Sequence, residues 1–455
     1  MSAARPRGRS SEQPAVDIPG LPARRTATRL LSAVVDAHTS LDGLTDNDHG
    51  HPHYLALSGR DRALVRAILT TALRFRGTIE ALIAARLERP LPGNAHALSH
   101  TLHVAAAQIL FLDVPDSAAV DLAVTQAKAD PRTARFAALV NGVLREIVRR
   151  KDRALPAALE KSIDVPAWFN DRLVGSYGEA GAREILAAHR LESPVDLTVK
   201  SDAPGWAERL GGLVLPTGGV RLARLDGALA ELPGFADGEW WVQDAAASIP
   251  AQLFGDISGL RVADLCAAPG GKTAQLAQAG ADVTALEISP NRAKRLAANL
   301  DRLQLRAEIV VGDLFAYQPT EMFDAVLLDA PCSSTGTVRR HPDVPWTKTP
   351  DDVAKLARLQ ARMLARTLEL VKPGGAVVFS NCSLDRSEGE DLLAAFLQEH
   401  SDARLVPIRP GEFPFADPYL TEEGTVRTTP ADLPMGSPAL SGLDGFFAAR
   451  LSRAQ

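Results

Sequence analysis

Cysteine is the residue type of this chain with the clearest capacity for chemistry. Two of the three, Cys332 and Cys382, each follow an apolar run with the pattern of a buried strand, FDAVLLD (323–329) and GAVVFSN (375–381). Amide groups at a helix start beyond such strands lower the pKa of a thiol. If the two strands are neighbours in one sheet, both thiols face one cleft. A thiolate there can attack carbon 6 of a pyrimidine and make carbon 5 nucleophilic toward an electrophilic methyl group, and a second cysteine can serve the later steps.

The third cysteine, Cys266, lies within DLCAAPGGKT (264–273), where a strand ends and a helix begins. A buried cysteine is usually a small hydrophobic residue, and we expect that of Cys266. Gly270 and Gly271 allow close approach of the backbone to a ligand, with amide groups exposed at the helix start. The stretch matches neither the dinucleotide-binding pattern G-x-G-x-x-G nor the P-loop pattern. The sequence therefore favours a ligand-binding loop of another kind.

Three acidic residues follow the strands of the same region. Glu287 ends the second strand, about 20 residues after the glycine-rich loop, where a carboxylate can bind the diol of a ribose. Asp313 ends the third strand and could accept a hydrogen bond from an adenine amino group, and Asp329 ends the fourth. Three carboxylates around one glycine-rich loop predict a pocket for an adenosyl group.

The elements that must hold these residues alternate from about residue 241 onward. Apolar strand patterns at 260–266, 282–289, 307–313, 323–329 and 375–381 are separated by helical patterns, and a helix over 387–400 and two late strands complete the region. Strands alternating with helices form a mostly parallel, doubly wound α/β sheet, which binds ligands outside the carboxyl ends of its strands. The two cysteines and the acidic residues are expected at that edge.

The chain before this region is of a different kind, and we predict four parts. Residues 1–22 are expected to be a disordered basic tail. Residues 23–155 carry helical patterns separated by turn residues and predict an all-α domain, and residues 156–240 predict a small α+β connector. Residues 241–455 form the α/β domain.

Residues 1–155 hold 21 Lys and Arg against 15 Asp and Glu, whereas the remainder holds 29 against 40. The basic first part suggests a contact with a polyanion, or else helices solvated by arginine.

Composition narrows the class of protein further. Of the 455 residues, 46% are hydrophobic and 23% charged, which is ordinary for a globular protein, and no apolar run approaches the length of a membrane span. Three cysteines without an apolar signal sequence predict a cytoplasmic protein without disulfides, and their spacing matches no zinc site. We therefore expect no metal and no membrane partner.

The motifs together resemble a known family. DLCAAPGGKT, LDAPCSSTG (328–336) and NCSL (381–384) are similar to those of the Nop2/Sun RNA cytosine-5 methyltransferases, and the similarity covers about 241–455. LSGRDRALVRAILTTALRFRG (57–77) and LVNGVLR (139–145) resemble the NusB-like RNA-binding domain. This combination of domains implies a bacterial 16S rRNA methyltransferase that uses S-adenosyl-L-methionine, acts on naked RNA or an early ribosomal particle, and is a monomer.

The resemblance also implies roles for individual residues. Cys382 is expected to be the nucleophile, Cys332 to assist breakdown of the covalent adduct, and Asp329 to bind the cytosine near ring nitrogen 3. DNA cytosine methyltransferases use a Pro-Cys nucleophile similar to Pro331–Cys332, so the reverse assignment stays open. The expected cofactor-binding residues share the glycine-rich loop and the acidic strand ends: Cys266, Ala267, Ala268, Pro269, Gly270, Gly271, Lys272, Glu287, Asp313 and Asp329.

The sequence departs from the family pattern at two positions. Asn381 stands where the family usually has threonine before the nucleophile, and Ser334 stands where it usually has glycine. Both residues are small and polar, so the departures concern fine geometry.

Two other functions are weighed: a non-catalytic NusB-like RNA-binding or antitermination adaptor, and a nucleotide-dependent oxidoreductase. The two cysteines and the acidic strand ends argue against the first, and the missing glycine pattern argues against the second.

Overall fold

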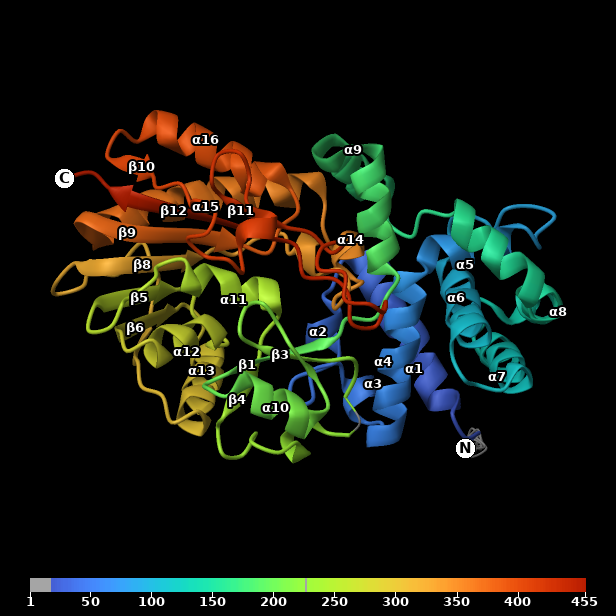
Figure 1. The fold of residues 1–455 in the computed structure, drawn as a ribbon. Helices are drawn as coiled ribbons and strands as arrows, with labels where there is room; N and C mark the ends of the chain where they lie inside the picture. Colours follow the sequence, from blue (N-terminus) through green and yellow to red (C-terminus); the bar gives the residue numbers. More distant parts are fainter. Residues whose placement is uncertain (1–17, 226) are drawn as a thin grey trace, which may run out of the picture. The chain divides into compact units, whose positions relative to one another are not determined.

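The computed structural model describes residues 18–225 and 227–455, and the chain divides into two compact units, Met1–Ser162 and Ile163–Gln455. The first unit is helical throughout its described residues (Figure 1). Its helices are α1 (Leu21–Ala37), α2 (Leu41–Leu44), α3 (Pro52–Leu55), α4 (Gly59–Arg74), α5 (Arg76–Ala84), α6 (His96–Phe111), α7 (Asp116–Ala129), the 3-10 turn η1 (Ala134–Phe136) and α8 (Ala137–Lys161).

Two boundaries of this unit differ from the sequence prediction. Most of the predicted tail, residues 1–17, lies outside the described residues, but α1 already begins at Leu21, with Pro22 in its first turn, where the missing backbone donor costs nothing. At the other end α8 continues past residue 155 to Lys161, although Pro156 removes one backbone donor from it. The exact division of the chain into four parts stays a prediction.

The second unit begins with α9 (Ala167–His189), which bends at Gly178, and a small α+β region. Four short strands form a sheet in the order β2-β3-β1-β4, with every neighbouring pair antiparallel. Its elements are β1 (Val195–Val199), α10 (Ala203–Leu210), β2 (Leu213–Val214), β3 (Val220–Leu222), the 3-10 turn η2 (Leu229–Glu231) and β4 (Trp240–Val242). The predicted limit of this region at residue 240 therefore falls inside its last strand.

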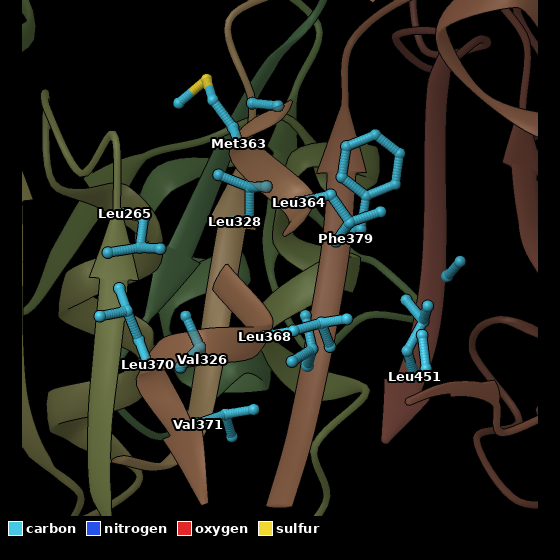
Figure 2. Close-up of a cluster of buried hydrophobic side chains, with 14 of the residues drawn as sticks. Leu265, Val326, Leu328, Met363, Leu364, Leu368, Leu370, Val371, Phe379 and Leu451 are labelled. Carbon is cyan, nitrogen blue, oxygen red and sulfur yellow. The ribbon is translucent and has the colours of Figure 1, made fainter. Parts of the chain in front are cut away.

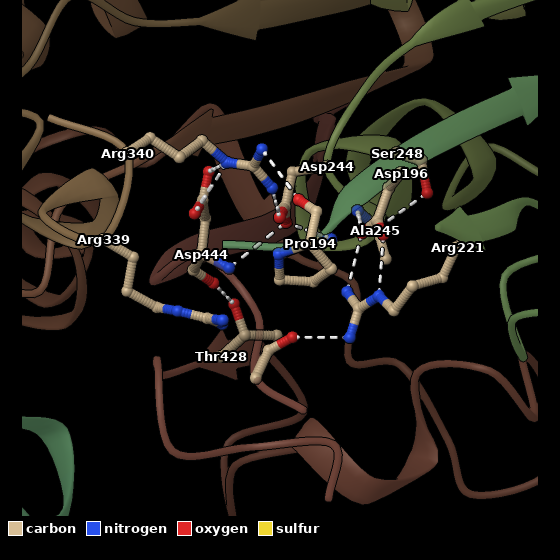
Figure 3. Close-up of polar contacts among 12 residues, drawn as sticks. Pro194, Asp196, Arg221, Asp244, Ala245, Ser248, Arg339, Arg340, Thr428 and Asp444 are labelled. Carbon is tan, nitrogen blue, oxygen red and sulfur yellow. Dashed lines mark hydrogen bonds and ion pairs between the residues drawn. The ribbon is translucent and has the colours of Figure 1, made fainter. Parts of the chain in front are cut away.

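Hydrogen bonds of a buried arginine join this small sheet to the rest of the second unit (Figure 3). Arg221 of β3 binds Asp196 of β1 through two hydrogen bonds of 2.7 Å, and both side chains are at most 1% exposed. Arg221 also donates to the carbonyl oxygens of Leu440 and Gly442, each at 2.8 Å. The small sheet is thereby fixed to the loop that precedes the last strand of the chain.

The large sheet of the second unit confirms the predicted doubly wound fold. Its order is β10-β12-β9-β8-β5-β6-β7, with β11 paired to β12, and the five strands from β9 to β7 are parallel. The parallel strands are β5 (Arg261–Leu265), β6 (Asp282–Glu287), β7 (Glu308–Val311), β8 (Phe323–Asp329) and β9 (Val371–Asn381). The chain leaves β5 for β6 on one side and returns to β8 on the other, so the sheet has its switch point between β5 and β8.

Three late strands complete the sheet, one more than the sequence predicted: β10 (Ala403–Leu405), β11 (Val426–Thr428) and β12 (Phe446–Arg453). β10 and β11 are only three residues long, and such short strands carry little period-two signal. Both pair antiparallel with β12, which itself runs antiparallel to β9. These two strands are therefore defined by their hydrogen bonds to β12 and not by a pattern in their own sequence.

Helices cover both faces of the sheet (Figure 1). On one face lie α15 (Pro350–Leu370) and α16 (Glu390–Glu399), and on the other α11 (Ala245–Gln252), α12 (Gly271–Gln278) and α13 (Pro290–Arg302). Short elements near the site are η3 (Thr335–Thr337), α14 (Val344–Thr347), η4 (Arg386–Glu388) and η5 (Asp417–Tyr419).

Strand β8 shows why both faces are apolar. Val326 and Leu328 point to the α15 face, where they meet Leu364 and Leu368 (Figure 2), whereas Leu327 belongs to the opposite core. Side chains alternate along a strand, so a strand buried on both sides reads as a continuous apolar run. This core holds the carboxyl ends of β8 and β9 in fixed positions.

Candidate active site

The two cysteines lie together at the carboxyl edge of neighbouring strands. β8 and β9 pair in parallel, with Asp329 opposite Ser380, so the chain segments that leave them emerge side by side. Cys332 follows β8 by three residues and Cys382 directly follows β9. Their sulfur atoms are 3.4 Å apart, and both side chains are half-buried. The expectation that both thiols face one cleft is met because their strands are direct neighbours.

The surroundings of the two thiols differ. The hydrogen bond with Cys332 lowers the pKa of Cys382. Burial and the negative charge of Asp329 oppose this, while the Ser334 hydroxyl and Lys272 add to the lowering. The pKa of Cys332 is raised by the same hydrogen bond, by burial and by the negative charge of Glu388. The directions of these two shifts favour loss of the pair's first proton from Cys382, with Cys332 as the remaining thiol.

Asp329 and Lys272 form an ion pair beside the thiols. The Lys272 ammonium lies 2.7 Å from the Asp329 carboxylate and 4.9 Å from the ring centre of Phe446. The other oxygen of Asp329 accepts a hydrogen bond of 2.9 Å from the Ser380 hydroxyl. Because Lys272 comes from the start of α12 and Asp329 from the end of β8, the pair spans the switch point of the sheet.

The glycine-rich loop passes from Cys266 to the start of α12. Gly270 has φ 105°, and a Cβ atom there would lie 2.4 Å from Cδ1 of Leu296. Only glycine satisfies both the backbone angle and the close approach of α13. Burial raises the pKa of the Cys266 thiol to about 12, in keeping with its expected role as a small hydrophobic residue.

A cavity of about 340 Å³ lies at the ends of β6, β7 and β8 and reaches both thiols. Its lining includes Glu287 and Asp313. Glu287 is the last residue of β6 and is 1% exposed; its carboxylate accepts from the backbone N–H groups of Ala268 at 3.3 Å and Ser289 at 2.9 Å. Asp313 does not end β7 as predicted, because that strand stops at Val311, before Gly312.

The same cavity has apolar walls. Leu286, Leu314, Phe315 and Met363 line it, together with the polar groups described above. An adenosyl group needs an apolar slot for its base, acceptors for its amino group and ribose hydroxyls, and a backbone that approaches closely. The residues of this cavity therefore fit an adenosyl group of S-adenosyl-L-methionine.

Lys272 and Asp329 line a second cavity of about 570 Å³. Trp241 of β4 and Phe446 of β12 line it, together with Arg340. Both cavities are bordered by Cys266, Ala268, Asp329 and Cys382. Two adjoining cavities that meet at a thiol can hold a donor in one and an acceptor in the other.

Three further residues contribute to this site without having been expected there. Ser334 adopts φ 59°, Asp264 at the end of β5 is 1% exposed, and Glu388 is fully buried among hydroxyl groups of both cysteine loops. The family usually has glycine at the position of Ser334, and that glycine was a signal for a left-handed backbone there. A carboxylate inside the apolar strand RVADL was a signal for Asp264. Nothing local marked Glu388.

Fold and site together define a class: a methyltransferase with a doubly wound sheet, an adenosyl-type cavity and a cysteine pair at the carboxyl edge of that sheet. Comparison with known proteins agrees. The family model described as 16S rRNA methyltransferase RsmB/F matches residues 257–452, and that of the NusB family matches residues 21–149.

The relatives cover most of the chain. The ribosomal RNA small subunit methyltransferase B of Serratia proteamaculans is 36% identical over 77% of this chain and 85% of its own. That of Klebsiella pneumoniae strain 342 is 33% identical over 94% and 97%. A solved methyltransferase homolog protein from Pyrococcus horikoshii is 29% identical, with a TM-score of 0.51 over 62% of this chain and 93% of that one.

The chain belongs to the RsmB/F family of 16S rRNA methyltransferases. Its cofactor is S-adenosyl-L-methionine and its substrate is RNA. Among the residues that the structure describes, no helix has both the length and the apolar character needed to cross a membrane.

Proposed function

We propose that this enzyme methylates carbon 5 of a cytosine in 16S rRNA through a covalent adduct, with Cys382 as nucleophile and Cys332 as resolving group. The observation that carries the proposal is the pair of sulfur atoms 3.4 Å apart, in which Cys382 has the lowered pKa and Cys332 the raised one. A nucleophile must be present as thiolate, whereas a group that assists release must hold or move a proton.

The residues suggest the following order of events. The Cys382 thiolate adds to carbon 6 of the cytosine in the second cavity, while Asp329 binds the ring near nitrogen 3 and favours the protonated adduct. S-Adenosyl-L-methionine supplies the electrophilic methyl group that carbon 5 accepts. The carbon 5 proton then leaves to a base, the bond between sulfur and carbon 6 breaks, and Cys382 is regenerated. Cys332, in contact with that sulfur, assists this last stage.

We assign the cofactor to the cavity at the ends of β6 and β7. Glu287 would bind the ribose hydroxyls and Asp313 the adenine amino group. The loop Cys266, Ala267, Ala268, Pro269, Gly270, Gly271 and Lys272 would lie along the amino-acid part, and Asp329 would border both ligands. We further propose that the enzyme works as a cytoplasmic monomer, on naked RNA or an early ribosomal particle, and that its chemistry needs no metal ion.

A denaturing gel tests the roles of the two cysteines. Each variant is incubated with RNA and cofactor. Cys332→Ala should attack and methylate but fail to release, which gives a retarded band that RNase removes. Cys382→Ala has no thiolate to add and should give no such band. The parent enzyme is the control and should turn over without trapping RNA.

The opposite pattern, a trapped band for Cys382→Ala alone, would exchange the two roles. Absence of a band from both variants, with methylation retained in both, would exclude the covalent mechanism. Bisulfite sequencing of 16S rRNA from cells with and without the gene then shows whether the product is 5-methylcytosine and at which nucleotide.

A further inference from the structure

Glu388 is a buried carboxylate next to the cysteine pair. It is the last residue of η4, between β9 and α16, and its side chain is 0% exposed. A carboxylate removed from water is costly unless hydrogen bonds or charges compensate it. Burial raises the pKa of Glu388, and hydrogen bonds from Ser333 and Ser383 oppose that rise. The local hydrogen bonds therefore explain how the side chain is accommodated.

The donors to this carboxylate come from both cysteine loops. One oxygen accepts from the backbone N–H of Ser333 at 2.9 Å, and the other accepts from the hydroxyl groups of Ser333 and of Ser383, the latter at 2.6 Å. Ser333 directly follows Cys332, and Ser383 directly follows Cys382. A single side chain thus binds the residue after each of the two cysteines.

Two buried amides hold Glu388 itself in place. Gln360 of α15 donates to its carboxylate at 2.8 Å, and Asn381 donates to its backbone carbonyl oxygen at 2.7 Å. Asn381 also donates to Gln360 at 3.2 Å and accepts from the backbone N–H of Ser383 at 3.0 Å. The carboxylate is therefore fixed relative to both the sheet and the covering helix.

We propose that Glu388 is a positioning residue that holds the loops of Cys332 and Cys382 at the separation that resolution of the adduct requires. It acts through Ser333 and Ser383 and does not touch the substrate. The importance of that separation rests on the cysteine roles proposed above. A shift of about 1 Å between reacting groups can cost about a hundredfold in rate, so a support shared by both loops bears directly on turnover.

The test measures the distance between the thiols and turnover separately. Diamide oxidises the Cys332 and Cys382 thiols to a disulfide and is itself reduced to the hydrazine. The rate at which peptide mapping detects this cross-link reports how often the two sulfurs meet. Glu388→Ala should slow cross-linking and lower kcat, each by about tenfold or more. Glu388→Gln keeps the volume and part of the hydrogen bonding and should fall between Glu388→Ala and the parent. The affinity for S-adenosyl-L-methionine should stay the same.

Glu412→Gln is the matched control, because the Glu412 carboxylate binds Arg450 at 2.7 Å and neither serine. It should leave cross-linking and kcat as in the parent. Cross-linking at the parental rate in folded Glu388→Gln and Glu388→Ala would overturn the proposal, even if activity falls. Because cross-linking needs no RNA and no adduct, its result stands apart from the gel result on the covalent mechanism.

Discussion

Ser334 has two opposing effects: its backbone conformation is strained, and its hydroxyl acts on the pKa of a cysteine. Its φ of 59° lies in the left-handed region, where a residue with a Cβ is strained by about 1 kcal/mol or more. Its hydroxyl, however, lowers the pKa of Cys382, which glycine could not do. Serine in place of the usual family glycine thus has a chemical effect in this chain: its hydroxyl lowers the pKa of Cys382.

Ser334→Gly should therefore make the protein more stable and Cys382 less reactive. We expect the free energy of unfolding to rise by up to about 1 kcal/mol, and the pH at which iodoacetamide half-maximally alkylates Cys382 to rise. Ser334→Ala separates the effects, because it loses the hydroxyl and keeps the strain. An unchanged alkylation profile in both variants would show that the hydroxyl does not act on the thiol.

Asp264 predicts a dependence of stability on pH. Burial raises its pKa to about 7, against an ordinary value of 3.8, and one of its oxygens has no hydrogen-bond partner among the described residues. The folded state binds this proton more tightly than the unfolded state does. The stability that the group contributes is thus fully present below its ordinary pKa and lost as the pH rises through about 7.

Asp264→Asn removes that titration. Relative to the parent, the variant should gain stability between pH 5 and pH 8, measured as the difference in urea midpoint of the ligand-free proteins. A constant difference across this range would mean that Asp264 is already ionised at pH 5. Asp324→Asn, at an ion pair with Lys372 at the protein surface, serves as the control.

At the scale of elements, the contact between the small sheet and the large one depends on buried charge. Asp196 of β1 accepts from Arg221 and from the backbone N–H of Ala245 at the start of α11, at 3.0 Å. Removing one member of a buried ion pair leaves the other charge unpaired, whereas replacing both by apolar residues of similar size is often neutral.

Asp196→Ala should accordingly lower the free energy of unfolding of the second unit by about 3–5 kcal/mol. The double variant Asp196→Leu with Arg221→Met should recover much of that loss. Urea denaturation of the full-length chain, followed by tryptophan fluorescence, checks both. If the double variant is as unstable as Asp196→Ala, the hydrogen bonds of Arg221 to Leu440 and Gly442 stabilise more than the ion pair does.

At the scale of the whole molecule, charge is distributed unevenly along the chain. Residues 1–162 hold 22 Lys and Arg against 16 Asp and Glu. In the first unit, Arg25, Arg29 and Arg132 line one cavity of about 460 Å³. Cations that contact RNA phosphates release counterions, so binding weakens as salt rises.

Deleting residues 1–162 should weaken RNA binding about tenfold or more at low salt and make its salt dependence shallower. Binding of S-adenosyl-L-methionine should be retained. Fluorescence anisotropy at several salt concentrations and calorimetry measure the two. Changing Arg25, Arg29 and Arg132 to Gln in the full chain tests charge without deletion. Equal RNA affinity of the truncated and full chains would assign the first unit another purpose.

The sequence alone determined much of the molecule, because the relevant signals are local. Continuous apolar runs predicted β5, β6 and β8, and the residues that end two of these strands, Glu287 and Asp329, lie where they were expected. Glycines and motif spacing predicted the loop that we assign to the cofactor. Such patterns depend on neighbours within a few residues, so they can be recognised in the sequence without knowledge of the packing.

Only the tertiary structure decided how these pieces meet. The 3.4 Å between Cys332 and Cys382 joins residues 50 positions apart, and Glu388 reaches a serine 55 positions away. No local pattern encodes such distances, because they follow from which strands pair and how α15 packs on them. Nor could the left-handed backbone of Ser334 be read from a serine, since the fold imposes it against the residue's own preference.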